Sequence, residues 1–160
     1  MAEWREQYAR MQRWQGRLWL GVEHLVARDD QGLVDAFYAF AQTCYHLVDW
    51  LDNDHSQHVR RRAAEQYVES RPMLAYCGDI CNGSKHAQLQ AKRVEVTMRK
   101  TISSFSVEDE TGESHDHVVE QPELFVRWGD GFIDADSFAR QCIEEWDRFL
   151  RGERLLPPEA

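Results

Sequence analysis

Two short segments of the chain repeat the same polar residue types at helical spacing. The first places a histidine, an aspartate and an asparagine three and then four residues apart, at His46, Asp49 and Asn53. The second repeats these intervals in the reverse order of types and adds a lysine, at Asp79, Asn82, Lys85 and His86. Because residues three, four and seven apart share one helix face, each set is expected to line one face. Two such faces turned toward each other would form a polar pocket.

This combination of side chains suits metal-independent cleavage of an RNA phosphodiester. The reaction needs a base for the 2′-hydroxyl proton, an acid for the leaving 5′-oxygen and a cation for the charge on the phosphorane. His46 and His86 are the candidates for acid and base, because imidazole ordinarily titrates near neutral pH. Lys85 is the candidate cation, and the carboxylate and amide of the second segment would orient histidine and substrate. The candidate catalytic set is His46, Asp49, Asp79, Asn82, Lys85 and His86.

The same residues support two other interpretations. Two histidines and two carboxylates suit a Zn, Mn or Fe centre, which helical bundles hold on facing helices. These four ligands would be His46, Asp49, Asp79 and His86. A structural polar network between two helices also accounts for them, because a buried aspartate needs a partner. No cofactor is predicted, and the question of a metal stays open on the sequence.

The four cysteines give no sign of a metal site in their spacing. They are Cys44, Cys77, Cys81 and Cys142, and no second pair of ligands accompanies the close pair. Without a recognisable signal peptide, they are expected to be reduced, mostly buried thiols in a cytoplasmic protein. No apolar run approaches the roughly 20 residues of a membrane span.

Charge is distributed unevenly along the chain. The net charge is −9, with 14 basic and 13 acidic residues through Phe105, and 5 basic and 15 acidic residues from Ser106 onward. This excludes a surface-wide basic footprint for nucleic acid, so that any RNA contact must be local. The clearest local patch is Arg60–Arg62. The acidic stretch over 108–116 is an alternative functional feature, an arm for a homodimer or another protein partner in a non-catalytic interaction protein.

The pattern predicts a single domain over 1–160, of the mainly α class. We expect an antiparallel four- or five-helix bundle with a β-hairpin, over about 92–130, inserted before the last helix. Apolar residues at helical spacing predict helices over 3–28, 33–53, 57–69, 73–90 and 137–151. Alternating, β-branched residues predict strands over 93–102 and 118–128. Asp134 or Asp136 is expected to cap the last helix.

The two polar segments also carry a resemblance to a known family. They read Tyr-His-x-x-Asp-Trp from Tyr45 and Asp-x-x-Asn-Gly-Ser-Lys-His from Asp79. On these motifs the chain resembles the HEPN superfamily, and more closely uncharacterised bacterial helical proteins that carry both motifs. The resemblance covers about residues 33–89. It implies a small bacterial helical protein of the kind found as ribonucleases in toxin–antitoxin and phage-defence systems. HEPN nucleases carry an arginine before their histidine, whereas here Lys85 adjoins His86.

Overall fold

The computed structural model describes residues 3–18, 30–54, 59, 62–85, 94–108 and 110–158. Its helices are α1 (Glu3–Gly16), α2 (Asp30–Asn53), α3 (Ala63–Glu69), α4 (Pro72–Lys85) and α5 (Ala135–Gly152). Its strands are β1 (Glu95–Glu108), β2 (Ser114–Trp128) and β3 (Gly131–Asp134). None of the described helices combines the length and apolar character that crossing a lipid bilayer demands.

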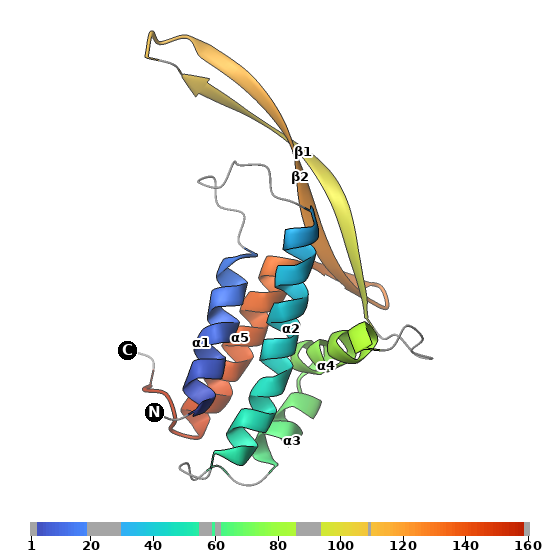
Figure 1. Ribbon diagram of the computed structural model, residues 1–160, viewed down its shortest axis with the longest axis vertical. Helices are drawn as coiled ribbons and strands as arrows, with labels where there is room; N and C mark the ends of the chain where they lie inside the picture. Colours follow the sequence, from blue (N-terminus) through green and yellow to red (C-terminus); the bar gives the residue numbers. More distant parts are fainter. Residues whose placement is uncertain are drawn as a thin grey trace.

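Three helices, α1, α2 and α5, lie alongside one another and enclose most of the core (Figure 1). Aromatic side chains fill the space between them. Trp4 of α1 and Trp146 of α5 have no exposed surface, and Phe37 of α2 packs on Phe138 of α5 with ring centroids 5.9 Å apart. Burial of side chains of this size is the main stabilising term of such a core.

The strands form one antiparallel sheet in the order β1-β2-β3. Residues directly opposite each other share a face, so the pairs Val96–Val126 and Met98–Leu124 lie on one side of the sheet. Val126 and Leu124 are buried against the helices. At the end of β2, the ring of Trp128 lies 5.6 Å from that of Tyr76 and joins the sheet to α4.

The predicted fold class is wrong, because the chain has a mixed α/β fold. The strands are 14, 15 and 4 residues long, and the third of them was not expected. After Trp128 the chain turns into β3, which pairs with β2 over Phe125–Trp128. Because the base of this sheet is buried against the helices, the sheet is part of the core and not an insertion in a helical bundle.

Several element boundaries also differ from the predictions. α2 begins at Asp30, ahead of the predicted start of this helix at Leu33. α1 ends at Gly16, and the remainder of the predicted first helix, from Trp19, lies outside the described residues. Pro122 lies within β2 opposite Lys100. Among the described strands, β3 pairs only with the end of β2, so Pro122 lies where no described strand covers the outer edge of β2, and proline is tolerated there.

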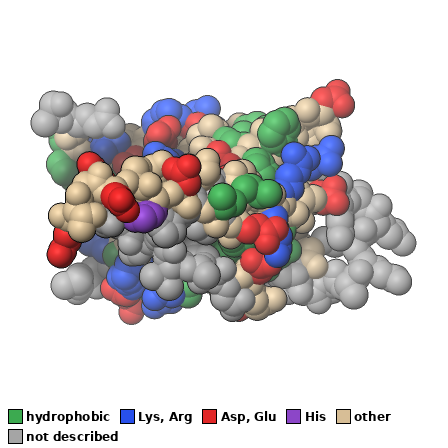
Figure 2. Space-filling model, turned by 90° about the horizontal axis from the view of Figure 1, so that it is seen from above, with side chains coloured by type: hydrophobic (Ala, Val, Ile, Leu, Met, Phe, Trp, Pro, Cys, Tyr) green, Lys and Arg blue, Asp and Glu red, His purple; other side chains and the backbone are tan. Residues whose placement is uncertain are grey.

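The outer half of the hairpin extends beyond the ends of the helices (Figure 1). Seen from this end, hydrophobic side chains are exposed among acidic and basic ones (Figure 2). Ile102 of β1 is 73% exposed and Val118 of β2 is 69% exposed. The face that is buried at the base of the sheet is therefore uncovered further along the same two strands.

Candidate functional site

The first polar segment forms a local pair on the surface of α2. His46 Nδ1 lies 3.2 Å from Asp49 Oδ2, one helical turn away, and the two side chains are 40% and 69% exposed. Since the carboxylate can only accept, Nδ1 carries the donated proton, and in the neutral imidazole Nε2 is then the unprotonated nitrogen. Asn53 donates from Nδ2 to the backbone carbonyl oxygen of Asp49 at 2.7 Å, so its side chain binds to the backbone of α2 itself.

Tyr45 joins this part of α2 to α4. A Cβ built on Gly78 would lie 2.7 Å from Tyr45 Cε2, so the tyrosine ring occupies the space that a side chain at residue 78 would need. Tyr45 also meets His46 edge-on, with centroids 6.0 Å apart. Burial, and after it the negative charge of Asp49, raises the pKa of Tyr45, so that the phenol keeps its proton and remains a hydrogen-bond donor.

The second polar segment lies on α4, directly after the Tyr45–Gly78 contact. Asp79 is partly buried and Asn82 is exposed. The helix continues through Asn82 and Gly83 as far as Lys85. The side chain of Lys85 and the whole of His86 lie outside the described residues. The structure thus brings the first half of this segment close to α2 and does not place its second half.

A His/Asp metal centre does not form among the described residues. His46, Asp49 and Asp79 do not bring three ligand atoms together in the part of the chain that the structure describes. The fourth expected ligand, His86, lies outside it. The local basic patch is likewise described only at Arg62, where the guanidinium pairs with Glu65 at 2.5 Å.

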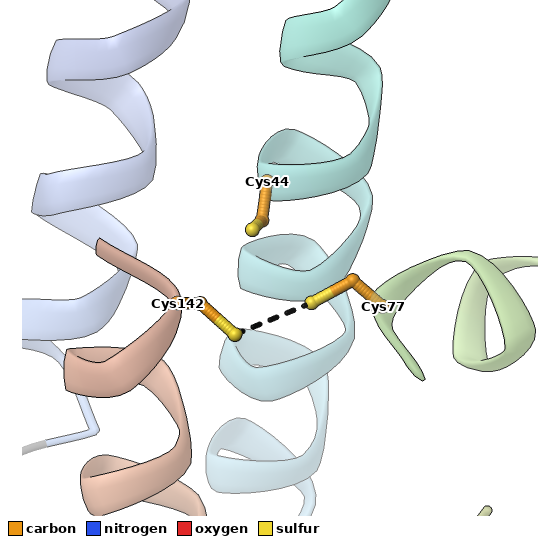
Figure 3. Close-up of side chains that lie close together, drawn as sticks. All are labelled: Cys44, Cys77 and Cys142. Carbon is orange, nitrogen blue, oxygen red and sulfur yellow. Dashed lines mark hydrogen bonds between the residues drawn. The ribbon is translucent and has the colours of Figure 1, made fainter. Parts of the chain in front are cut away.

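A different group of ligand atoms gathers in the core. Cys44 of α2, Cys77 of α4 and Cys142 of α5 point toward one another, and their sulfurs all lie within 4.8 Å (Figure 3). The Sγ atoms of Cys77 and Cys142 are 3.7 Å apart. All three side chains have no exposed surface. Sequence reasoning predicted buried thiols here but missed their convergence, because the three cysteines are separated by 33 and 65 residues.

The three thiols differ in their ease of ionisation. Burial raises the pKa of Cys77 and of Cys142 well above the ordinary value. At Cys44 burial acts in the same direction, but the thiols of Cys142 and Cys77 and the indole of Trp146 outweigh it and hold the pKa of Cys44 well below its usual range. Cys44 is therefore the sulfur that most readily carries negative charge.

The candidate site accordingly has two separate parts, a surface pair on α2 beside α4 and a buried cluster of three thiols. Cys81, although buried, is not a member of the cluster. No family model, curated protein or solved structure matches the chain.

Proposed function

We propose that the protein acts on RNA at the face formed by α2 and α4, as a HEPN-like, metal-independent ribonuclease. The observation that carries the proposal is the His46–Asp49 pair at 3.2 Å. A carboxylate on Nδ1 fixes the imidazole tautomer and leaves Nε2 as a base. An exposed pair of this kind can reach a 2′-hydroxyl without a closed pocket.

The contact between Tyr45 and Gly78 supports the participation of α4 in the same face. It sets Asp79, the next residue of α4, beside the part of α2 that carries His46. Lys85 follows Gly78 by seven residues, about 10 Å along a helix axis. The face is therefore elongated, and an extended RNA strand lying along α4 would meet the histidine at one end and the lysine at the other.

The phenol of Tyr45 supports a local contact with a phosphate. The protonated phenol of Tyr45 is 36% exposed and adjoins His46. A neutral hydroxyl donor there can hydrogen-bond to one phosphate oxygen, and a large basic surface that releases counter-ions is not needed for such a contact.

The proposal assigns a role to each residue of the candidate set. His46 takes the 2′-hydroxyl proton, and His86 protonates the leaving 5′-oxygen. Lys85 stabilises the charge on the phosphorane, and Asp79 and Asn82 orient the substrate.

The test is cleavage of a mixed RNA pool with and without EDTA, by the wild type and by His46→Ala and His86→Ala. The proposal predicts cleavage that survives EDTA and falls about 10²–10⁴-fold in each variant, the usual contribution of an acid or base. His115→Ala, an exposed histidine of the hairpin, is the matched control and should cleave like the wild type. Cleavage abolished by EDTA, or equal in all four proteins, contradicts the proposal.

A second candidate function is protein interaction through the hairpin, and the occupant that we infer is a second copy of the chain. Ile102 and Val118 continue, on the same sheet face, the buried row that ends in Leu124 and Val126. A two-stranded ribbon is marginally stable by itself in water, so that covering this face in a dimer would stabilise both arms. On the same face Glu120 lies directly opposite Ile102 and pairs with Lys100 at 3.5 Å, so the interface would be mixed, with this ion pair between its apolar contacts.

Light scattering after size exclusion tests this second function. The wild type is expected to run as a dimer, and Ile102→Asp or Val118→Asp as a monomer, because a charge is costly in an apolar contact. Val107→Asp is the matched control, since Val107 is 45% exposed but lies on the opposite face of the ribbon. A monomeric wild type rules out self-association through the arm.

A further inference from the structure

We propose that Cys44, Cys77 and Cys142 form a buried site for one thiophilic cation of the closed-shell d10 type, Zn²⁺ or Cu⁺. The site is independent of the RNA-directed function proposed for the surface of α2 and α4. It would tie together α2, α4 and α5 at the point where Figure 3 shows their sulfurs converging.

The spacing of the sulfurs fits a single ion. Two sulfurs bound at about 2.3 Å to one tetrahedral zinc lie roughly 3.8 Å apart. The Cys77 and Cys142 sulfurs are 3.7 Å apart, and the third sulfur lies within 4.8 Å of both. Small side-chain rotations at Cys44 would therefore complete a three-sulfur shell. Thiolate ligands select Zn²⁺ and Cu⁺ over harder cations.

The surroundings of the cluster also suit a bound thiolate set. Trp146 is fully buried, and its indole Nε1 has no hydrogen-bond partner of normal geometry among the residues that the structure describes. It nevertheless lies near enough to Cys44 to favour the thiolate there. A buried N–H that lacks a full partner carries a cost, and a metal-bound thiolate would provide a stronger acceptor than a thiol does.

Binding of the metal ion must release protons from the thiols. Each thiol that becomes a ligand gives up its proton, so that one cation entering three thiols displaces up to three protons and no oxidant is needed. The three thiolates and the ion together carry a net charge of minus one with Zn²⁺ and of minus two with Cu⁺. Because all three sulfurs are shielded from solvent, the ion would enter during folding or a local opening of α4 against α5.

Metal competition on the reduced full-length chain tests the site. Zn²⁺ is offered against a chromophoric zinc chelator and Cu⁺ against a Cu⁺ chelator under anaerobic conditions, and one equivalent per chain is expected for at least one of them. Cys44→Ser, Cys77→Ser and Cys142→Ser should each weaken binding by more than tenfold. Cys81→Ser is the matched control, because Cys81 is equally buried but lies outside the cluster. It should bind like the wild type.

X-ray absorption on the wild type covers the case in which a core variant fails to fold. Three sulfur neighbours at about 2.3 Å from the ion support the site. The number of further neighbours distinguishes a three-coordinate Cu⁺ from a four-coordinate Zn²⁺. A shell made of nitrogen and oxygen, binding retained in the cluster variants, or no binding of either ion by the reduced wild type would overturn the proposal.

Discussion

At the scale of single residues, the contact of Gly78 with Tyr45 is the tightest constraint on how α2 meets α4. An alanine Cβ at residue 78 would lie 2.7 Å from Tyr45 Cε2, closer than two carbon atoms can approach without displacement. Gly78→Ala should therefore destabilise the protein by about 1–3 kcal/mol from overpacking, partly offset by about 1 kcal/mol of helix propensity. The measurement is urea denaturation followed by circular dichroism.

Gly152→Ala is the control for this prediction. Gly152 is also helical, and a Cβ there would meet nothing within 4 Å. We expect this change to be neutral or stabilising. If the two substitutions shift the free energy of unfolding equally, the close approach of Tyr45 is not a real constraint.

The hydrogen bonds of Glu145 lead us to expect that the stability of the folded protein depends on pH. It accepts hydrogen bonds from Arg148 at 2.7 Å and Tyr67 at 2.9 Å. Burial acts against ionisation, but these donors outweigh it, so the pKa of Glu145 is lowered. A lowered folded-state pKa stabilises the protein above the unfolded pKa of about 4.3, and this stabilisation is lost as the pH falls through the folded value.

Glu145→Gln should thus lower stability at pH 7 and flatten its decline on acidification, as measured by thermal unfolding between pH 7 and pH 3. Glu144→Gln changes the exposed neighbour, and stability should fall with decreasing pH as steeply in this variant as in the wild type. If stability falls equally steeply on acidification in the wild type and in Glu145→Gln, the lowered pKa of Glu145 is contradicted.

At the scale of elements, Asp134 couples the end of β3 to the start of α5. Its Oδ1 accepts the Ser137 backbone N–H at 2.8 Å, which satisfies one of the free donors at the helix N-terminus. Asp134→Ala should cost about 1 kcal/mol, and lower Tm by about 2–4 °C in a chain of this size. Asp130→Ala, in the exposed turn before β3, should change Tm little. Equal Tm losses would show that the cap contributes nothing.

The elements also show which predictions a local pattern can support. The cap at Asp134 was predictable, because it joins residues three apart. The full length of β1 and β2 was not, because serine-rich and acidic residues beyond Ile102 lack the alternation that signals a strand. Antiparallel pairing across the turn extends both strands where their own propensity is weak.

At the scale of the whole molecule, the error in fold class and the missed cluster have one cause. Whether a sheet is an appendage or part of the core depends on packing between distant segments, here the burial of Leu124 and Val126 by the helices. The meeting of Cys44, Cys77 and Cys142 depends on the same long-range packing. A single sequence carries the period of each element but not their arrangement, so neither feature was predicted.

The central claim, that the α2–α4 face cleaves RNA without a metal, is tested most directly by the ends of the products. End-labelled RNA is incubated with the wild type in EDTA, and the 3′-ends are identified. Attack by the 2′-hydroxyl predicts 2′,3′-cyclic phosphate ends, no cleavage of DNA of the same sequence, and at least 100-fold slower cleavage by His46→Ala. No cleavage at all, or products with 3′-hydroxyl and 5′-phosphate ends, would contradict the account.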